Sequence, residues 1–348
     1  MKRRNVEPAA LSLQFSTASV APGQREQFFI DLSQCASLLN RRFYRQGLNW
    51  AVAGIKITTS GDGVITTQKL PNTWTMSNAW HKGLANWQRM NNEAMEEAES
   101  VRPRFMDFKI YANARHHAKG YGDNLLPLSI STDPAGATTA NVATPGEWEP
   151  SKFRIPIGVT NPGDTTDREV IAVGPNFPGA GASGVNAVSL IEGYAASRGL
   201  PDITDPNTPD DASDATGLNP ENWMGALFSD GTEQTAAVLA DLIEDNNQAP
   251  YPFENGQVPG AAPGTVFTDT QYPGGANQLQ GLEIHDLSFI TPTTIGGSTR
   301  IAGGSFPCGL MAFTWEPSVE SNTANIAIQL DLVPGPHRGY MALPMQGM

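Results

Sequence analysis

The sequence has little of what holds together small secreted proteins or anchors membrane proteins. Its 348 residues include two cysteines, Cys35 and Cys308, and no apolar run approaches the roughly 18 residues that a membrane helix requires. The start of the chain also lacks the unbroken apolar stretch of a signal peptide. Two distant cysteines favour free buried thiols, with a single bridge as the alternative. We therefore expect no disulfide framework, no secretion and no membrane partner.

Signatures of enzymes are also scarce. The chain has no P-loop, no dinucleotide-binding glycine motif after a strand and no HExxH pair. The stretch 181–184, Gly-Ala-Ser-Gly, has its second glycine one residue too early for a nucleophile elbow, so we interpret it as a loop. His116 and His117 are adjacent near an expected strand end, where their rings would point to opposite faces and remain solvated.

Two further groups of polar residues are interpreted as structural and not as catalytic or metal-binding. His285 and Asp286 interrupt an alternating strand, which indicates a β-bulge in preference to an acid–base pair. The carboxylates and the amide of one short span lack the order of a calcium loop, so we expect a solvated acidic loop there. These residues are Asp205, Asn207, Asp210, Asp211 and Asp214. The sequence predicts no catalytic residue, no metal site and no cofactor, and we do not expect an enzyme.

Basic residues are scarce in the later part of the chain. No Lys or Arg occurs between Arg198 and Arg300. Residues 1–120 hold 16 of the 22 Lys and Arg but 9 of the 35 Asp and Glu, a balance of +7, whereas the remainder has a balance of −20. An ordinary globular protein can show this asymmetry, but it also suits a protein with one surface on a polyanion and another in solvent.

The most regular stretch is a helical pattern followed by a strand pattern. Apolar residues recur every three or four positions over 77–99, which predicts an amphipathic helix capped by Ser77 and ended by Pro103. The period then changes to two over residues 105–113, with Phe108 and Ile110 on the same face. The helix is therefore expected to lead into a half-buried strand.

Alternating segments elsewhere predict a β-rich fold. Strands are expected near residues 11–15, 28–32, 50–59, 64–69, 153–159, 168–173, 282–290, 306–315 and 324–333. Pro156 marks its strand as an edge strand or a bulge. No βαβ alternation or internal repeat is visible, which leaves an antiparallel sandwich or barrel with inserted helices. The expected core of a two-sheet sandwich includes Phe28, Ile30, Phe108, Ile110, Ile155, Ile157, Ile326 and Ile328.

Residues 175–280 have a different texture. Gly and Pro are frequent, acids accumulate from Asp202 to Asp245, and short helices are expected at 185–197 and 235–246. Such a segment is a poor source of core strands, so we interpret it as a long surface insertion. Its acids would repel packaged phosphate, which places it on the outer surface of any nucleic-acid-filled particle.

Two groups of cations are candidates for contact with nucleic acid. Three guanidinium groups with an interleaved aromatic ring can neutralise phosphates and stack a base. The alternatives for this cluster are helix C-cap cations or salt bridges to a partner. A short basic arm stands at the start of the chain. The candidate residues are Lys2, Arg3, Arg4, Arg41, Arg42, Tyr44 and Arg45.

Three passages carry a family resemblance. They are DLSQCASLLNRRFYRQGLNWAVAGIKI (31–57), a discontinuous passage over 70–117 that begins LPNTWTMSNAWHKGL and ends RFMDFKIYANARHH, and VPGPHRGYMALPM (333–345). Together they resemble the capsid proteins of small circular, Rep-encoding single-stranded DNA viruses. The resemblance implies one eight-stranded jelly roll, and a homo-oligomer of 60 copies or a multiple that forms an icosahedral shell around circular single-stranded DNA.

The resemblance also implies a virion location after assembly inside the host cell, with a host receptor that the sequence does not identify. Such proteins often begin with a long Arg/Lys-rich arm, whereas here only Lys2, Arg3 and Arg4 stand in its place. Genome contact is then expected on the folded basic region, or it is weak, or it needs another component. The alternative function is a non-viral or particle-associated β-sandwich that binds carbohydrate or a receptor through its loops.

The expected organisation has four parts. Residues 1–20 form a short basic arm and lead-in strand, and 21–174 form the first part of the jelly roll with its helix. Residues 175–280 form the acidic surface insertion, and 281–348 supply the closing strands and the C-terminal tail. The predicted fold class is therefore all-β, a single jelly-roll antiparallel β-sandwich with about eight core strands, inserted helices and long surface loops.

Overall fold

The computed structural model describes residues 7–96, 107–156, 165–197, 223–229, 281–293 and 298–347. Most of this part is β-structure. The chain divides into two compact units: Met1–Thr73 with Lys119–Glu149 and Leu282–Met348, and Trp74–Ala118 with Pro150–Gly281. Among the described helices, none combines the length and apolar character that crossing a bilayer demands. Several predictions fall outside the described residues, namely those on Lys2, Arg3, Arg4, Ile157, the stretch 205–214 and the helix at 235–246.

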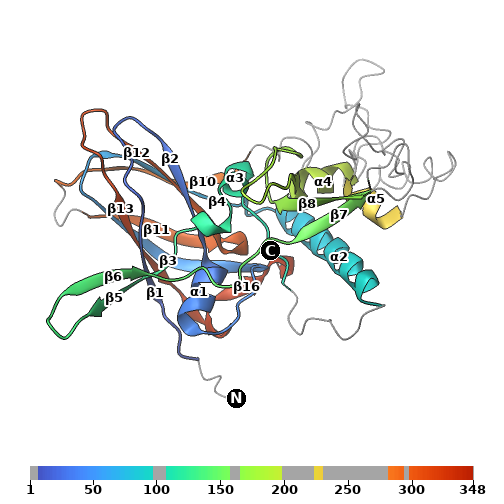
Figure 1. The fold of residues 1–348 in the computed structure, drawn as a ribbon, viewed down its shortest axis with the longest axis horizontal. Helices are drawn as coiled ribbons and strands as arrows, with labels where there is room; N and C mark the ends of the chain where they lie inside the picture. The colour runs from blue at the N-terminus through green and yellow to red at the C-terminus, as the bar shows by residue number, and fades with distance from the viewer. Residues whose placement is uncertain are drawn as a thin grey trace, which may run out of the picture. The chain divides into compact units, whose positions relative to one another are not determined.

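Two antiparallel sheets form a β-sandwich in the first unit (Figure 1). One sheet has the order β1 (Ser12–Ser16), β13 (Ile326–Leu332), β3 (Leu48–Thr59), β11 (Ser298–Phe306), with β16 (Ala342–Pro344) added to β3. The other has the order β10 (Glu283–Ile290), β4 (Gly63–Lys69), β12 (Leu310–Pro317), β2 (Glu26–Asp31). The antiparallel β-sandwich expected from the alternating segments is therefore present.

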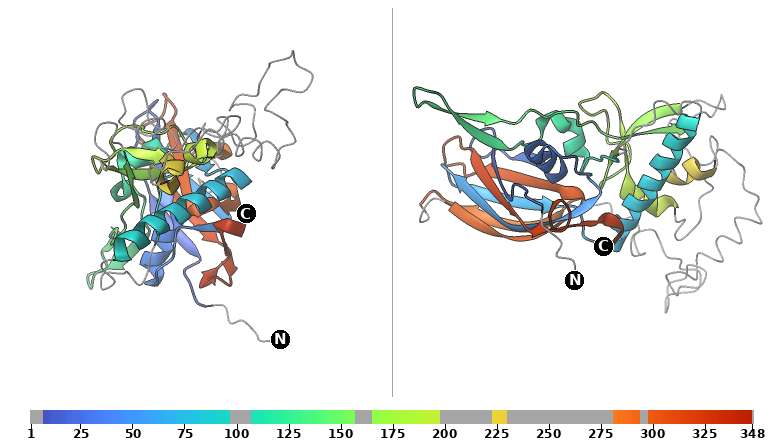
Figure 2. Two further views of the ribbon diagram at one scale, coloured as in Figure 1. Left: turned by 90° about the vertical axis from the view of Figure 1, so that its right-hand side faces the viewer. Right: turned by 90° about the horizontal axis from the view of Figure 1, so that it is seen from below.

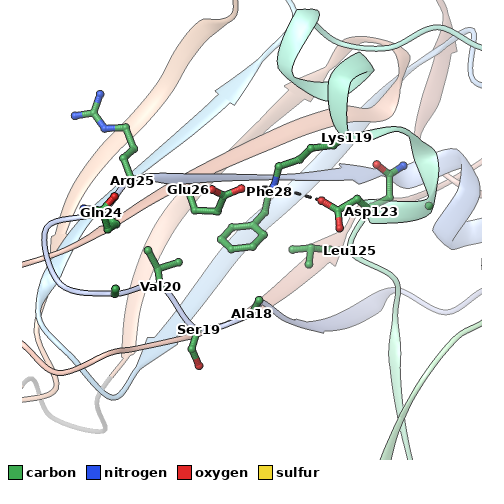
Figure 3. Close-up of a pocket in the computed structure, with 13 residues that line it drawn as sticks. Ala18, Ser19, Val20, Gln24, Arg25, Glu26, Phe28, Lys119, Asp123 and Leu125 are labelled. Carbon is green, nitrogen blue, oxygen red and sulfur yellow. Dashed lines mark ion pairs between the residues drawn. The ribbon is translucent and has the colours of Figure 1, made fainter. Parts of the chain in front are cut away.

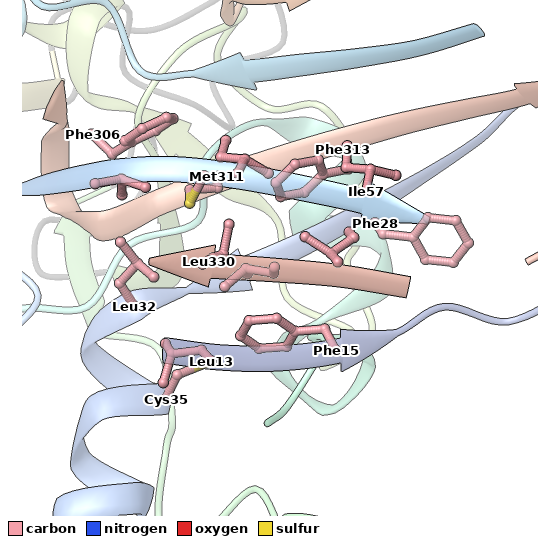
Figure 4. Packing of buried hydrophobic residues seen from close by; sticks show 14 of the residues in the cluster. Leu13, Phe15, Phe28, Leu32, Cys35, Ile57, Phe306, Met311, Phe313 and Leu330 are labelled. Atoms are coloured by element: carbon pink, nitrogen blue, oxygen red, sulfur yellow. The ribbon is translucent and has the colours of Figure 1, made fainter. Parts of the chain in front are cut away.

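The core of the sandwich lies between these two sheets (Figure 4). Strand β13 illustrates why it forms, because its alternate residues Ile326, Ile328 and Leu330 are fully buried while Ala327 between them is exposed. A pleated strand places such residues on one face, and burying that face removes apolar surface from water. Four of the predicted core residues belong to this cluster: Phe28, Ile30, Ile326 and Ile328.

Helix α1 (Leu32–Asn40) begins at a buried carboxylate. Asp31 Oδ1 accepts hydrogen bonds from the backbone amides of Ser33 at 2.8 Å and Gln34 at 3.3 Å, which satisfies two amides that a helix start leaves unpaired. Its Oδ2 accepts from Gln46 Nε2 at 3.0 Å and Trp148 Nε1 at 2.9 Å. One side chain thus ties β2, α1 and two loops together. Complete burial raises the pKa of Asp31 to about 6, although all four donors oppose the shift.

The second unit contains helices and a small mixed sheet. Its helices are α2 (Trp74–Glu96), α3 (Ala114–Lys119, which ends at the boundary with the first unit), α4 (Leu190–Ser197) and α5 (Trp223–Ser229). Strands β7 (Lys152–Pro156) and β8 (Thr165–Ile171) pair antiparallel, and β9 (Ala187–Ser189) pairs with β8 in parallel. Strand β7 lies at the sheet edge, as its proline predicted.

Three predicted core residues are buried, but not in the sandwich. Phe108, Ile110 and Ile155 are at most 1% exposed, yet all three belong to the second unit. The assignment of these residues to the sandwich core was wrong. Alternation identifies a buried face of a segment, but it contains no information on which core that face joins.

The strand predicted at 105–113 is largely absent from its described part. Residues 107–110 form no strand, and Tyr111 makes only an isolated parallel bridge to Ile171. The backbone of Lys109 instead pairs with Ser151, since its N donates to Ser151 Oγ at 3.0 Å and its O accepts from Ser151 N at 3.0 Å. Asn113, whose side chain accepts from His116 N at 2.9 Å, then starts α3. The preceding helix also begins earlier than predicted, at Trp74 instead of Ser77.

The described part of 175–280 differs from a surface insertion. Strand β9 is fully buried, and so are Leu190, Ile191 and Trp223. The expectation that this segment supplies no strand to a core is therefore wrong at residues 187–189. The apolar stretch at these residues is short. The many Gly and Pro residues around it dominate the composition of the segment, so the composition did not indicate a strand. Helix α4 also starts later than the predicted residue 185.

Strands β5 (Leu128–Thr132) and β6 (Thr138–Val142) form a hairpin that the sequence did not predict. Its strands are short, and Gly, Pro and Thr are frequent in and between them. The hairpin projects beyond the sandwich in Figure 1 and in the right-hand view of Figure 2. Strand β11 was also missed, since its glycines weaken the alternating pattern. The bulge predicted at His285 is confirmed by the register shift between Ile284 and Asp286, and both cysteines are free and buried.

Candidate nucleic-acid interface

Four arginines gather where α1 ends, and we call this group the Arg corner: Arg41, Arg42, Arg45 and Arg338. The first three follow α1 directly, whereas Arg338 comes from the C-terminal tail and donates from Nη1 to Phe43 O at 2.6 Å. Arg41, Arg45 and Arg338 are exposed, and Arg42 is half-buried. The sequence identified three of the four. Nothing in the local pattern around Arg338 could place it beside residues almost 300 positions earlier.

The C-terminal tail is fixed by three packed aromatic rings. Tyr44, Trp50 and Tyr340 have centroid separations of 5.9, 5.5 and 5.3 Å. The hydroxyl of Tyr44 donates to Arg338 O at 2.9 Å, and that of Tyr340 donates to Ala10 O at 2.7 Å. Tilted and edge-on aromatic contacts of this kind are favourable beyond their buried area. The tail therefore presents Arg338 from a defined position on the first unit.

The proposed stacking role of Tyr44 is contradicted by its burial. Its ring is 0% exposed and packed against Trp50 and Tyr340, so it cannot lie against a nucleic-acid base. The Tyr44 ring is buried because it packs against Tyr340 of the C-terminal tail, almost 300 positions later in the sequence. The half-buried aromatic in the corner is the preceding residue, Phe43, whose ring centroid lies 6.1 Å from that of Trp148.

Charge in the Arg corner is only partly compensated. Arg42 Nη1 lies 2.8 Å from Glu7 Oε2. In the described part of the chain, no ion pair engages Arg41 or Arg45. Glu147 and Glu149 flank Trp148 in the sequence, and the Trp148 ring lies near that of Phe43. Burial raises the pKa of the Tyr44 hydroxyl, while its hydrogen bond with Arg42 and the nearby charges of Arg42 and Arg338 oppose the rise. The corner therefore offers exposed guanidinium groups to an anion.

Backbone strain is concentrated in the same place. Arg41 and Arg338 have φ angles of 53° and 49°, in the left-handed region that residues with a Cβ seldom adopt. Among the described residues only two other non-glycine residues, Phe177 and Cys308, share this feature. Arg41 is the C-cap of α1, which bears out the helix-cap alternative for this residue. Left-handed residues other than glycine cost on the order of 1 kcal/mol each and cluster at functional sites.

Removal of the Tyr44 hydroxyl tests whether it fixes the tail. We expect Tyr44→Phe to lower the free energy of unfolding by about 0.5–1.5 kcal/mol, because one hydrogen bond is lost and Arg338 O loses a donor. Limited trypsin digestion should then cleave faster after Arg338. Cleavage after Arg25, an exposed arginine in the same unit, serves as the internal control and should not change. Unchanged cleavage at both sites would show that the hydroxyl does not hold the tail.

A cavity of about 610 Å³ lies elsewhere on the first unit, between the segment 18–28 and residues 119–125 (Figure 3). Lys119 forms ion pairs there with Glu26 and with Asp123, the latter at 3.3 Å, and its Nζ lies 5.2 Å from the centroid of Phe28. Two carboxylates thus surround one ammonium group. Arg25 also lines the cavity and pairs with Glu316. The lining thus carries both signs of charge, which suits a neutral polar ligand.

The adjacent histidines of the second unit are buried, not solvated as predicted. Both are at most 1% exposed, because they lie on helix α3 and not at a strand end. His116 Nδ1 accepts from Ala112 N at 3.0 Å, and His117 Nε2 lies 2.9 Å from Glu169 Oε2. The signal that could have identified the helix is Asn113, a residue type that favours helix starts.

The loop over residues 181–184 is a tight turn beside His117. A Cβ on Gly181 would come within 2.6 Å of His117 Nε2 and of its carbonyl oxygen, so only glycine fits this approach. Ser183 Oγ accepts from Val185 N at 3.4 Å, and His117 Nε2 faces Glu169. The geometry is that of a packed loop, as interpreted from the sequence. Across the residues that the structure describes, no group of three His, Cys, Asp or Glu side chains is placed to hold a metal ion.

The Arg corner is thus the best candidate for contact with an anionic partner, and the arm at Lys2, Arg3 and Arg4 lies outside the described residues. Comparison of the chain with family models, with curated proteins and with solved structures finds no match.

Proposed function

We propose that this chain is a viral capsid protein that assembles into a closed icosahedral shell around single-stranded DNA. The observation that carries the proposal is the pairing of the eight sandwich strands. The first pairs with the last, the second with the seventh, the third with the sixth and the fourth with the fifth: β1 with β13, β2 with β12, β3 with β11 and β4 with β10. A long hairpin rolled over itself into two sheets would have this pattern, so the nested pairing supports the proposed jelly roll.

A jelly roll alone does not define a function, since the fold also occurs in lectins and cupins. The capsid assignment therefore also draws on the three passages that resemble circular single-stranded DNA virus capsids. Two of them meet in the Arg corner, because Arg41, Arg42 and Arg45 come from the first and Arg338 from the last. The left-handed backbone of Arg338, which caps no helix, is the kind of cost that a binding role explains.

A second function is supported by the cavity beside Lys119. A sandwich protein that binds carbohydrate or a receptor through its loops needs a concave site with polar groups and an apolar wall. The cavity has carboxylates, an amide and the ring of Phe28. Electron microscopy of the purified full chain separates the two functions. Closed shells of one diameter support the capsid proposal, and a protein that forms no shells under any assembly condition would contradict it.

The salt dependence of DNA binding tests the Arg corner. Each phosphate neutralised on a single strand lowers log K by about 0.7 per unit of log salt concentration. We expect Arg41→Gln, Arg42→Gln and Arg45→Gln together to reduce the slope by about 2, since 0.7 is lost for each contact. Adding Arg338→Gln should remove a further contact. The measurement is the affinity for a single-stranded oligonucleotide as a function of salt.

The matched control for this experiment is Arg25→Gln, which removes an exposed arginine of the same unit outside the Arg corner. Its slope should equal that of the unchanged protein, and circular dichroism should report the same fold for all variants. If the triple variant keeps the full slope, the arginines serve contacts between subunits, and the short arm or another molecule neutralises the genome.

A further inference from the structure

The β5–β6 hairpin has one apolar face that is largely exposed to solvent. Leu128 lies opposite Val142, and Ile130 lies opposite Ala140, so these four side chains share a face. Ile130 is 76% exposed and Val142 is 64% exposed. The other face is polar, and there Asn141 Nδ2 donates to Ser131 Oγ at 2.8 Å. The hairpin is therefore amphipathic, with its apolar side in solvent.

An isolated two-stranded hairpin is only marginally stable in water, because it lacks a partner for its apolar face. Asp133 at the turn is the one charged residue between Asn124 and Glu147, so electrostatic repulsion does not keep other surfaces away. Exposed apolar surface on a projecting element indicates an interaction site. The question is which surface covers it.

Strand β10 carries the complementary surface. Ile284, Leu287 and Phe289 are 58%, 63% and 64% exposed. Their partners on β4 are Gln68, Thr66 and Val64, which alternate with the buried Ile65 and Thr67. Cross-strand partners point to the same side of a sheet, so the three apolar side chains lie on the outer face of the sandwich. We call them the β10 patch.

The hairpin and the β10 patch lie at opposite edges of the sandwich. Strand β5 lies beside β1, an edge strand of one sheet, and Leu125 just before the hairpin donates from its backbone N to Phe29 O of β2, at the same side of the other sheet. Strand β10 is the far edge strand, next to β11. One copy therefore cannot bring its own hairpin onto its own patch, but a neighbouring copy can.

We propose that the apolar face of the β5–β6 hairpin docks on the β10 patch of a second copy of this chain. The inference rests on the proposed function, which requires copies of the chain to contact one another. A contact between two different surfaces at opposite edges is heterologous, and such contacts close into rings when the rotation permits. Each copy thus donates one hairpin and receives another.

Charge substitutions on the two surfaces provide the first test. Ile130→Asp and Leu287→Asp should each weaken association of the full chain about tenfold or more, because each removes one buried apolar side chain and adds a charge. Ser131→Asp, on the polar face of the hairpin, and Val319→Asp, an apolar residue that is 80% exposed elsewhere, are the matched controls. Sedimentation velocity measures association, and circular dichroism reports folding. Normal association of both Ile130→Asp and Leu287→Asp would overturn the inference.

Cross-linking provides a second test that needs no destabilised variant. Chains with Ile130→Cys and chains with Leu287→Cys, distinguished by a tag, are mixed and treated with a short bismaleimide. Cys35 and Cys308 are 0% exposed, so of the thiols only the introduced ones are accessible to the reagent. We expect tagged–untagged dimers from the mixture and none when Ser131→Cys replaces Ile130→Cys. Absence of the mixed dimer would overturn the inference.

The two proposals fail separately. Shells that form without the Ile130–Leu287 cross-link would contradict the hairpin contact and leave the capsid function standing. A mixed dimer from a chain that never forms shells would contradict the capsid function and support the contact.

Discussion

Replacing Asp31 with alanine is expected to lower the free energy of unfolding at pH 7 by about 3–5 kcal/mol, since it leaves buried donors unpaired. Two backbone amides of α1, Gln46 Nε2 and Trp148 Nε1 would lose their acceptor. The matched control is Asp133→Ala in the hairpin turn, where the exposed carboxylate accepts from Ala137 N. That change should cost about 1 kcal/mol or less, because water replaces the lost acceptor. Chemical denaturation of both variants makes the comparison.

The contribution of Asp31 also depends on pH, with a sign that follows from its raised pKa. Between the unfolded value of 3.8 and the folded value of about 6, the folded chain keeps a proton that the unfolded chain has released. The unfolding free energy therefore falls as pH rises through this window, by about 3 kcal/mol from this group. The advantage of the unchanged protein over Asp31→Ala should shrink between pH 4 and pH 6.5. An advantage that grows with pH would mean that the four hydrogen bonds outweigh burial.

Truncation of Ile328 should have the second large effect. This side chain is 0% exposed, lies between Phe15 and Ile57 on neighbouring strands, and belongs to the sandwich core. Ile328→Ala is expected to cost about 2–5 kcal/mol, because the lost methyl groups leave a cavity that the sheets cannot close. Ile130→Ala is the matched control, and at 76% exposure it should change the stability of the monomer by less than about 0.5 kcal/mol.

The readout for Ile328 is the denaturant midpoint with an unchanged m-value. Equal effects at Ile328 and Ile130 would show that the sandwich core is not packed as described. Ile110 extends the experiment to the second unit, where it is also 0% exposed. Ile110→Ala should cost a similar amount, for the same reason.

Local patterns were sufficient for most strands of the sandwich. The alternation in β2, β3, β4 and β13 identified the residues of one face, and Phe28, Ile30, Ile326 and Ile328 are buried together as expected. These predictions succeeded because a half-buried strand needs period-two alternation, whatever its partners are. The same reasoning found Phe108 and Ile110 but assigned them to the wrong unit. A local pattern indicates which residues are buried. The core to which they belong depends on contacts with residues that are distant in the sequence.

The candidate site likewise has a part that the sequence predicted and a part that it did not. The cluster Arg41, Arg42 and Arg45 is visible in the sequence because its charges are neighbours. The contact between residues 43–44, which follow α1, and the C-terminal tail brings Arg338 into the cluster and buries Tyr44. No spacing rule links residues 44 and 338, so the sequence could not predict either change.

What the sequence by itself determined is the class of the fold, the position of most strands, the bulge at His285 and the cluster of arginines that follows α1. Only the tertiary structure decided that the strands pair in nested order, that the histidines of α3 are buried and that a hairpin with an exposed apolar face stands at one edge of the sandwich. The physical reason is the range of the interactions. Periodicity and capping act over a few residues, whereas pairing, burial of a helix and the absence of a partner depend on segments hundreds of residues apart.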